Sequence, residues 1–242
     1  MKPALIFAAW PYVSLSGLCL GIVLRFFLGE RHMPSLKAKL LESWEAFGGS
    51  RSWLISMTLL LLGHFAGVAF PQQILLWDRS AIGLYALESL AFAIGALTLA
   101  GWAVLVWRHV KRSHGSLAAE VADTIFFAFT LTALFSGLLI ATLYRWGSFW
   151  GVITLRPYLV SVLQGAPAAG FVTQMPFLVR LHVFSSFAAV ALVPFTRLAP
   201  VLVLALHRGV DLLSKPISAI AHAAEGWLPR HSVAEWIWPP ED

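Results

Sequence analysis

The chain has 242 residues, of which 59% are hydrophobic and 12% are charged, with a formal net charge of +5. Soluble domains carry about 25% charged residues, so this composition excludes an ordinary globular domain, which could not cover its surface with so few charges. The same composition excludes a disordered chain, and the single cysteine, Cys19, excludes a disulfide scaffold. A polytopic membrane protein remains.

Five apolar runs are long enough to cross a hydrocarbon core of about 30 Å. They cover residues 4–28, 52–70, 81–107, 123–144 and 177–206. Lipid offers no hydrogen-bond partner to the backbone, so continuous runs of this length predict helices, whereas a β-barrel would show short alternating strands. The sequence therefore predicts an all-α bundle of five transmembrane helices in a single membrane domain over residues 1–242. The first run is too long for a signal-peptide core, and we expect it to be retained.

The segment from Trp150 to Gln174 is apolar but is interrupted by several glycines and prolines. It is a poor sixth span, and it predicts an interfacial helix that caps the bundle on its outer side, between the fourth and fifth spans.

Lysine and arginine are concentrated in the loops after the first and third runs and in the C-terminal tail. Because such residues mark the cytoplasmic side, we expect the N-terminus outside and the C-terminus in the cytoplasm, in a bacterial or archaeal cytoplasmic membrane. The positive net charge reflects this asymmetry, and no nucleic-acid partner is predicted.

Two histidines lie inside the predicted spans. His64 is about 9 Å from the outer end of the second run, and His182 is about 8 Å from the outer end of the fifth, at a rise of about 1.5 Å per residue. Two imidazoles at one depth in a helix bundle can bind a haem iron from both sides. The alternative is that each histidine forms a hydrogen bond between helices. Zinc is disfavoured because further ligands are missing at that depth.

The neighbours of both histidines fit a macrocycle. Gly63 and Gly67 flank His64 and leave room for a porphyrin, although small residues are also common in ordinary membrane packing. Arg180 could pair with a haem propionate. The chain lacks the Cys-x-x-Cys-His attachment motif, so any haem would be held non-covalently.

Several short motifs follow one another along the chain in an order that is typical of a known family. They are Pro11-Tyr12 with Leu24-Arg25, Gly63-His64-Phe65-Ala66-Gly67 followed by Pro71, and Arg180-Leu181-His182 followed by Pro194-Phe195-Thr196-Arg197-Leu198. In these motifs the chain resembles the respiratory nitrate reductase gamma subunit family, a membrane cytochrome b, over nearly its whole length. The resemblance implies haem b, axial ligation of its iron by His64 and His182, and electron exchange with quinone or quinol.

The family commonly binds a second haem, and here the chain departs from the pattern. The positions of the second ligand pair are occupied by Leu54 and Pro200, neither of which can bind iron. The resemblance therefore implies one haem. His207 lies on the same face as His182 but has no matching partner in the second run. We expect it to be structural or solvated, and we expect solvated side chains at the other histidines, His32, His109, His114, His222 and His231.

Glu88 lies in the third run, in the same leaflet as the histidine pair. We expect it to exchange protons with quinone, the alternative being a pair with an arginine or histidine of the bundle. Leu84 occupies the position of a lysine implicated at the family's quinone site. Asp123 begins the fourth run and is predicted to cap that helix.

A single outer haem predicts a redox partner at the outer face, such as a hydrogenase, a molybdenum enzyme, an iron–sulfur subunit or a cytochrome c. The chain would then anchor a respiratory oxidoreductase in the membrane and relay electrons, with no bond-making chemistry beyond quinone protonation. Three other readings stay open: a haem-free anchor or assembly subunit, a two-haem quinol oxidase subunit with a cytoplasmic partner, and a transporter.

Overall fold

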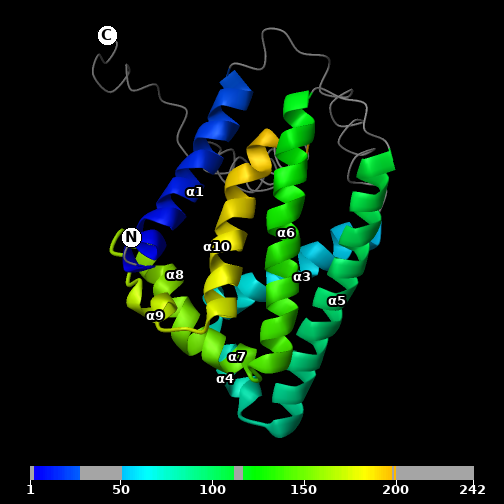
Figure 1. The fold of residues 1–242 in the computed structure, drawn as a ribbon. Helices are drawn as coiled ribbons and strands as arrows, with labels where there is room; N and C mark the ends of the chain where they lie inside the picture. The colour runs from blue at the N-terminus through cyan, green and yellow to red at the C-terminus, as the bar shows by residue number, and fades with distance from the viewer. Residues whose placement is uncertain (1–2, 28–50, 112–116, 198, 200–242) are drawn as a thin grey trace, which may run out of the picture. The chain divides into compact units, whose positions relative to one another are not determined.

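The computed structural model describes residues 3–27, 51–111, 117–197 and 199, all of which belong to one compact unit, Met1–Pro200. These residues form helices and turns without a strand. Five long helices are present, namely α1 (Pro3–Phe27), α3 (Arg51–Ala69), α5 (Ala81–Lys111), α6 (Leu117–Leu143) and α10 (Phe177–Leu192) (Figure 1).

All five helices are long and apolar enough to cross a membrane. The predicted all-α, five-span fold is therefore confirmed. The second compact unit, Val201–Asp242, lies outside the described residues. The single domain over residues 1–242 and the orientation of the termini stay predictions.

The helix ends differ from the predicted ones at three places. Helix α5 continues to Lys111, whose ammonium lies 4.4 Å from the centre of the Trp107 ring, and basic side chains in a last turn favour a helix C-terminus. Helix α6 begins at Leu117, so Asp123 lies inside the helix and the predicted cap is wrong. Helix α10 ends at Leu192, and a 3-10 turn, η3 (Val193–Phe195), follows because Pro194 has no N–H to continue the α-helix.

One end of the bundle is covered by short helices, and we call it the capped end. Here α3 ends, α5 begins, α6 ends and α10 begins (Figure 1). The cover consists of α4 (Pro71–Asp78), α7 (Gly147–Trp150), a π-helical turn η2 (Gly151–Leu155), α8 (Arg156–Leu163) and α9 (Gly170–Thr173). The predicted interfacial helix is thus a run of helical turns from Gly147 to Leu163, followed by a separate short helix.

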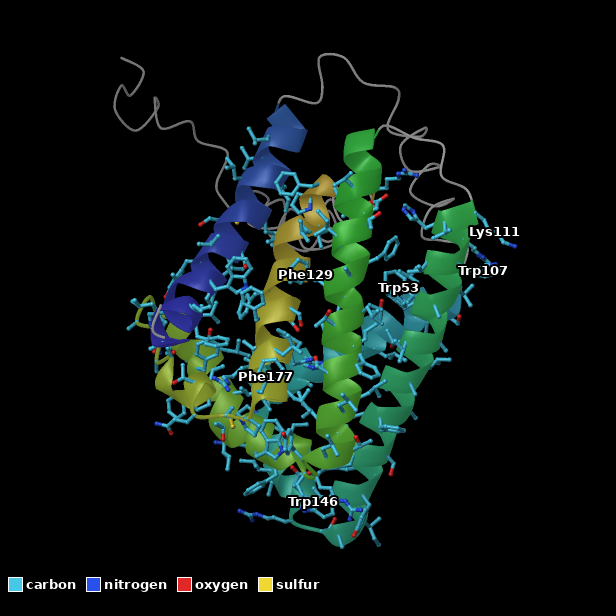
Figure 2. All side chains as sticks on the ribbon, viewed as in Figure 1. Trp53, Trp107, Lys111, Phe129, Trp146 and Phe177 are labelled. Carbon is cyan, nitrogen blue, oxygen red and sulfur yellow. The ribbon has the colours of Figure 1, made fainter. Side chains whose placement is uncertain are left out.

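Helix α10 packs between α1 and α6, and α5 packs against α6 and α3. At the capped end, the hydroxyl of Tyr158 donates a hydrogen bond to the carbonyl of Phe7 at 2.8 Å, and that of Tyr12 donates to the carbonyl of Val162 at 2.9 Å. These bonds attach α8 to α1. Figure 2 shows Trp146 at the capped end and Trp107 with Lys111 at the opposite end.

Helix α3 is the least enclosed span. Only 11% of it is buried, against 22% to 39% of the other four. Its main neighbour is α5, where Gly101 lies so close that a Cβ atom there would approach the Cα of Trp53 to 2.8 Å. The remaining close packing of α3 in the described part of the chain involves α4, η2 and α8. Helix α3 therefore faces α6 and α10 without packing closely on them.

Candidate functional site

The structure brings His64 of α3 and His182 of α10 together. The centres of the two imidazole rings are 6.1 Å apart, and the ring planes are inclined by 24°. The two histidines thus bridge the space between two helices that are not packed closely against each other.

Both rings have the same hydrogen-bond pattern. The Nδ1 atom of His64 lies 2.8 Å from the carbonyl oxygen of Leu60, and the Nδ1 atom of His182 lies 2.8 Å from that of Ala133. A carbonyl only accepts hydrogen bonds, so each Nδ1 carries the proton and donates, and each Nε2 keeps a free lone pair. This is the pattern of metal-binding histidines, in which one nitrogen binds the metal and the other is fixed by a hydrogen bond.

The separation of the rings fits one metal ion between them. A metal–imidazole bond is about 2 Å long. A ring nitrogen lies about 1.1 Å from the ring centre, since the bonds of the ring are about 1.3 Å long. Two imidazoles on opposite sides of one iron therefore have centres about 6 Å apart, close to the 6.1 Å found here. The hydrogen bond from His182 to Ala133 also joins α10 to α6. The alternative role considered from the sequence, a hydrogen bond between helices, is therefore present for His182.

Glycines lie beside both histidines. A Cβ atom at Gly63 would meet nothing within 4 Å, and one at Gly67 would meet only Val152, at 4.0 Å. Helix packing therefore does not require either glycine. Gly137 of α6 is different, because a Cβ atom there would lie 3.0 Å from Cε1 of His182. The sequence prediction missed Gly137, although Ala133, Ser136 and Gly137 form a stripe of small residues on α6.

Arg180 does not lie on the same face of α10 as His182. It lies about 200° around α10 from His182, since consecutive helical residues are about 100° apart. Its Nε atom is buried and has no hydrogen-bond partner in the described residues. A buried donor without a partner is costly, and an anion would relieve that cost.

Arg156 was missed as a site residue. Its Nε–H donates a hydrogen bond of 2.9 Å to the carbonyl of Val68, one helical turn beyond His64. The available signal was that Arg156 is the only charged residue between Trp150 and Gln174.

Glu88 contacts neither an arginine nor a histidine among the described residues. Its Oε1 atom accepts two hydrogen bonds from Ser148, one from the backbone N–H at 2.7 Å and one from the hydroxyl at 2.8 Å. The same hydroxyl lies 3.1 Å from Oδ1 of Asp78. Burial raises the pKa of Asp78 above its usual value, and the nearby charge of Glu88 raises it further, against the lowering effect of the Ser148 bond. Ser148 of α7 thus contacts both Glu88 of α5 and Asp78 of α4.

The opposite end of the bundle is filled by side chains. Trp53, Leu105, Phe126 and Phe127 form a buried cluster there. Leu54, at the position of a family ligand, is exposed, and Pro200 lies outside the described residues. His109 is partly exposed, with its ring 5.1 Å from that of Phe127, so its predicted solvation stays a prediction. His32, His114, His207, His222 and His231 also lie outside the described residues.

A buried ion pair is found near the same end. Oδ2 of Asp123 lies 3.1 Å from Nε of Arg197, and the backbone N–H of Arg197 donates to Oδ1 of Asp123 at 3.1 Å. In the part of the chain that the structure describes, no group of three or more His, Cys, Asp or Glu side chains could hold a metal ion. The histidine pair, with two ligands, is the candidate site that the geometry supports best.

Comparison with known proteins identifies the family. The family model described as nitrate reductase gamma subunit matches residues 3–211. The chain belongs to the nitrate reductase gamma subunit family. The resemblance predicted from the sequence motifs is therefore confirmed. Members of this family are membrane subunits and generally bind haem, and this chain is an integral membrane protein.

Two curated relatives are the nitrate reductase-like proteins NarX of Mycobacterium tuberculosis strains CDC 1551 / Oshkosh and ATCC 25618 / H37Rv. Each is 26% identical to this chain over 211 residues, which cover 82% of this chain. The match spans 31% of the length of each relative, so this gamma-type chain corresponds to about a third of either protein.

Proposed function

We propose that this chain is the cytochrome b subunit of a respiratory oxidoreductase. It holds one haem b non-covalently between His64 and His182 and relays electrons between a partner redox subunit and the quinone pool. The observation that carries the proposal is the pair of imidazoles with centres 6.1 Å apart, each with Nδ1 bonded to a carbonyl. Membership of the nitrate reductase gamma subunit family supports it.

Each residue of the site has a distinct role in this proposal. The bound haem supplies one-electron redox chemistry. His64 and His182 bind its iron through Nε2, while the carbonyls of Leu60 and Ala133 fix the tautomers and increase the basicity of the ligands. Gly63 and Gly67 would leave space for a macrocycle, and Arg180, whose buried Nε has no partner in the described residues, would pair with a propionate.

The proposal assigns one haem to the chain. Leu54 cannot bind iron, and Trp53, Leu105, Phe126 and Phe127 fill the opposite end of the bundle. Without a second cofactor, about 20 Å of the hydrocarbon core would separate this haem from the other face. The redox partner therefore docks at the capped end, the predicted outer side, where an iron–sulfur, molybdenum, hydrogenase or cytochrome c component would exchange electrons with the haem.

The proposal is tested by the optical spectrum of the purified chain, produced with haem supplied. We expect reduced-minus-oxidised bands of b type and one haem per chain. Protein without these bands would establish the haem-free anchor, and two haems per chain would establish the quinol oxidase subunit with a cytoplasmic partner.

Glu88 is proposed to take up the proton of a quinol as the electron passes to the haem. We expect Glu88→Gln to slow quinol-driven haem reduction by about 100-fold, since general bases contribute that much or more. Glutamine keeps an oxygen that accepts both bonds from Ser148, so the haem spectrum is unchanged. Thr142→Ala is the control, because that exposed hydroxyl bonds only to the carbonyl of Leu139. An unaltered rate in Glu88→Gln would remove Glu88 from the reaction.

Gly137→Ala is expected to lower the affinity for haem roughly tenfold, because overpacking of a close contact costs about 1–3 kcal/mol. The new Cβ atom would lie 3.0 Å from Cε1 of His182 and would displace the ring from Ala133. Haem titration of the apoprotein measures the effect. Gly17→Ala is the matched control, since a Cβ atom there makes an ordinary 3.8 Å contact with Ala191. Equal affinities in the two variants would show that the His182 ring tolerates displacement.

A further inference from the structure

Arg156 is the only charged residue in the largely apolar stretch from Trp150 to Gln174. It begins α8, directly after the π-helical turn η2, and its side chain is half-buried. No ion pair of Arg156 is found among the residues that the structure describes. A partly desolvated guanidinium without an anionic partner is energetically unfavourable, so binding of an anion at this position would be favourable.

The hydrogen bond to Val68 fixes where this cation lies. Val68 is the second-last residue of α3, and its carbonyl is one of the last four of the helix, which lack a partner within it. Val68 follows His64 by four residues, or one turn, on the way to the capped end. Val152 of the neighbouring turn approaches the Cβ position of Gly67 to 4.0 Å. The guanidinium is thus held beside the turn of α3 that follows His64.

Among the described residues, most of the hydrogen-bonding capacity of Arg156 has no partner. A guanidinium has five N–H donors in a planar fork, and the bond to Val68 uses the one on Nε. The four N–H groups on the two Nη atoms are suited to a carboxylate, which they can bind through two parallel hydrogen bonds. The site is therefore prepared for a carboxylate at the capped end of the histidine pair.

We propose that Arg156 binds a propionate of the haem held by His64 and His182, an inference that rests on the proposed function. A haem has two propionates, and the proposed function assigns one of them to Arg180. Arg156 then has two tasks, because Nε completes the end of α3 while the Nη groups compensate the charge of the second propionate.

A cation at this point affects the iron. Reduction adds one negative charge to the haem, so a nearby guanidinium stabilises the ferrous form more than the ferric form. Arg156 therefore raises the midpoint potential of the haem. An uncharged residue that caps α3 would have no such effect.

The test is a redox titration of the purified, haem-loaded chain at several pH values. Arg156→Gln removes the charge and keeps an amide N–H for Val68. We expect it to lower the ratio of ferrous to ferric haem affinity roughly tenfold, which equals about 59 mV for a one-electron couple. Arg156→Lys keeps the charge, and we expect it to retain most of the potential. Arg79→Gln, at an exposed position of the capped end, is the control and should leave the potential unchanged.

Haem dimethyl ester, in which both propionates are esterified, tests the contact itself. With this haem, Arg156→Gln and the wild-type chain are expected to bind with the same affinity, because the carboxylate that Arg156 would contact is missing. If Arg156→Gln cannot be isolated, the wild-type chain should bind the ester at least roughly tenfold more weakly than haem b. A wild-type potential in Arg156→Gln with haem b, or an affinity difference between the two proteins that persists with the ester, would overturn the inference. Absence of haem from the wild-type chain would instead overturn the proposed function.

Discussion

Replacement of His64 or His182 by alanine is expected to abolish stable haem binding. In the proposed site each imidazole supplies one of the two iron ligands, and the described residues hold no group of three or more His, Cys, Asp or Glu side chains that could bind the metal instead. We expect the haem content to fall by more than about tenfold, since a lost ligand contributes well over 1.4 kcal/mol. The reduced-minus-oxidised spectrum and the haem-to-protein ratio of the purified variants measure this loss.

The matched control is His109→Ala. His109 is half-buried against Phe127 near the end of α5, and its loss should leave the haem content unchanged. A wild-type spectrum in both His64→Ala and His182→Ala would show that the haem, if present, is bound elsewhere. Loss of haem in only one variant would show that the remaining histidine is sufficient as a single axial ligand.

Arg197→Leu is expected to destabilise the fold by about 3–5 kcal/mol, the usual cost of removing one partner from a buried ion pair. Asp123 is fully buried and Arg197 is 14% exposed, so the substitution would leave a carboxylate inside the bundle without its cation. The bond also joins α6 to the chain just after α10, near the end opposite the haem site. Denaturant unfolding of the purified protein followed by circular dichroism gives the change in the free energy of unfolding.

The double variant Asp123→Leu/Arg197→Leu separates the charge from the volume. Replacement of a whole buried pair by apolar residues is often nearly neutral, so the double variant should recover most of the lost stability. A double variant as unstable as Arg197→Leu would indicate that the packing of these side chains, and not their charges, stabilises this end.

The five spans were predictable because, in a chain with so few charges, an uninterrupted apolar run of sufficient length indicates a membrane-spanning helix. The approach of His64 and His182 was also predictable, since the rise of a helix converts sequence position into depth. Helix ends were harder. Asp123 looked like a cap because the apolar run starts there, but α6 begins at Leu117, so the residue became a buried partner of Arg197 instead.

Contacts that depend on helix rotation could not be read from one sequence. The carbonyl of Ala133 and the bare backbone of Gly137 meet the His182 ring because α6 turns that face toward α10. The bond from Arg156 to Val68 joins residues 88 positions apart, through a cap whose π-helical turn has no clear sequence signal. The depth of a residue in the membrane follows from counting residues along its helix. Which residues it contacts on other helices becomes known only from the structure of the packed bundle.

The sparse packing of α3 has a consequence for the stability of the protein in a cell. Helix α3 packs mainly on α5 and on the cap, so the proposed haem would be the group that joins it to α6 and α10. A ligand that binds only the folded chain stabilises it in proportion to the logarithm of its free concentration. Haem supply would then shift the fraction of this subunit that is folded, and copies without haem would be more susceptible to proteolysis.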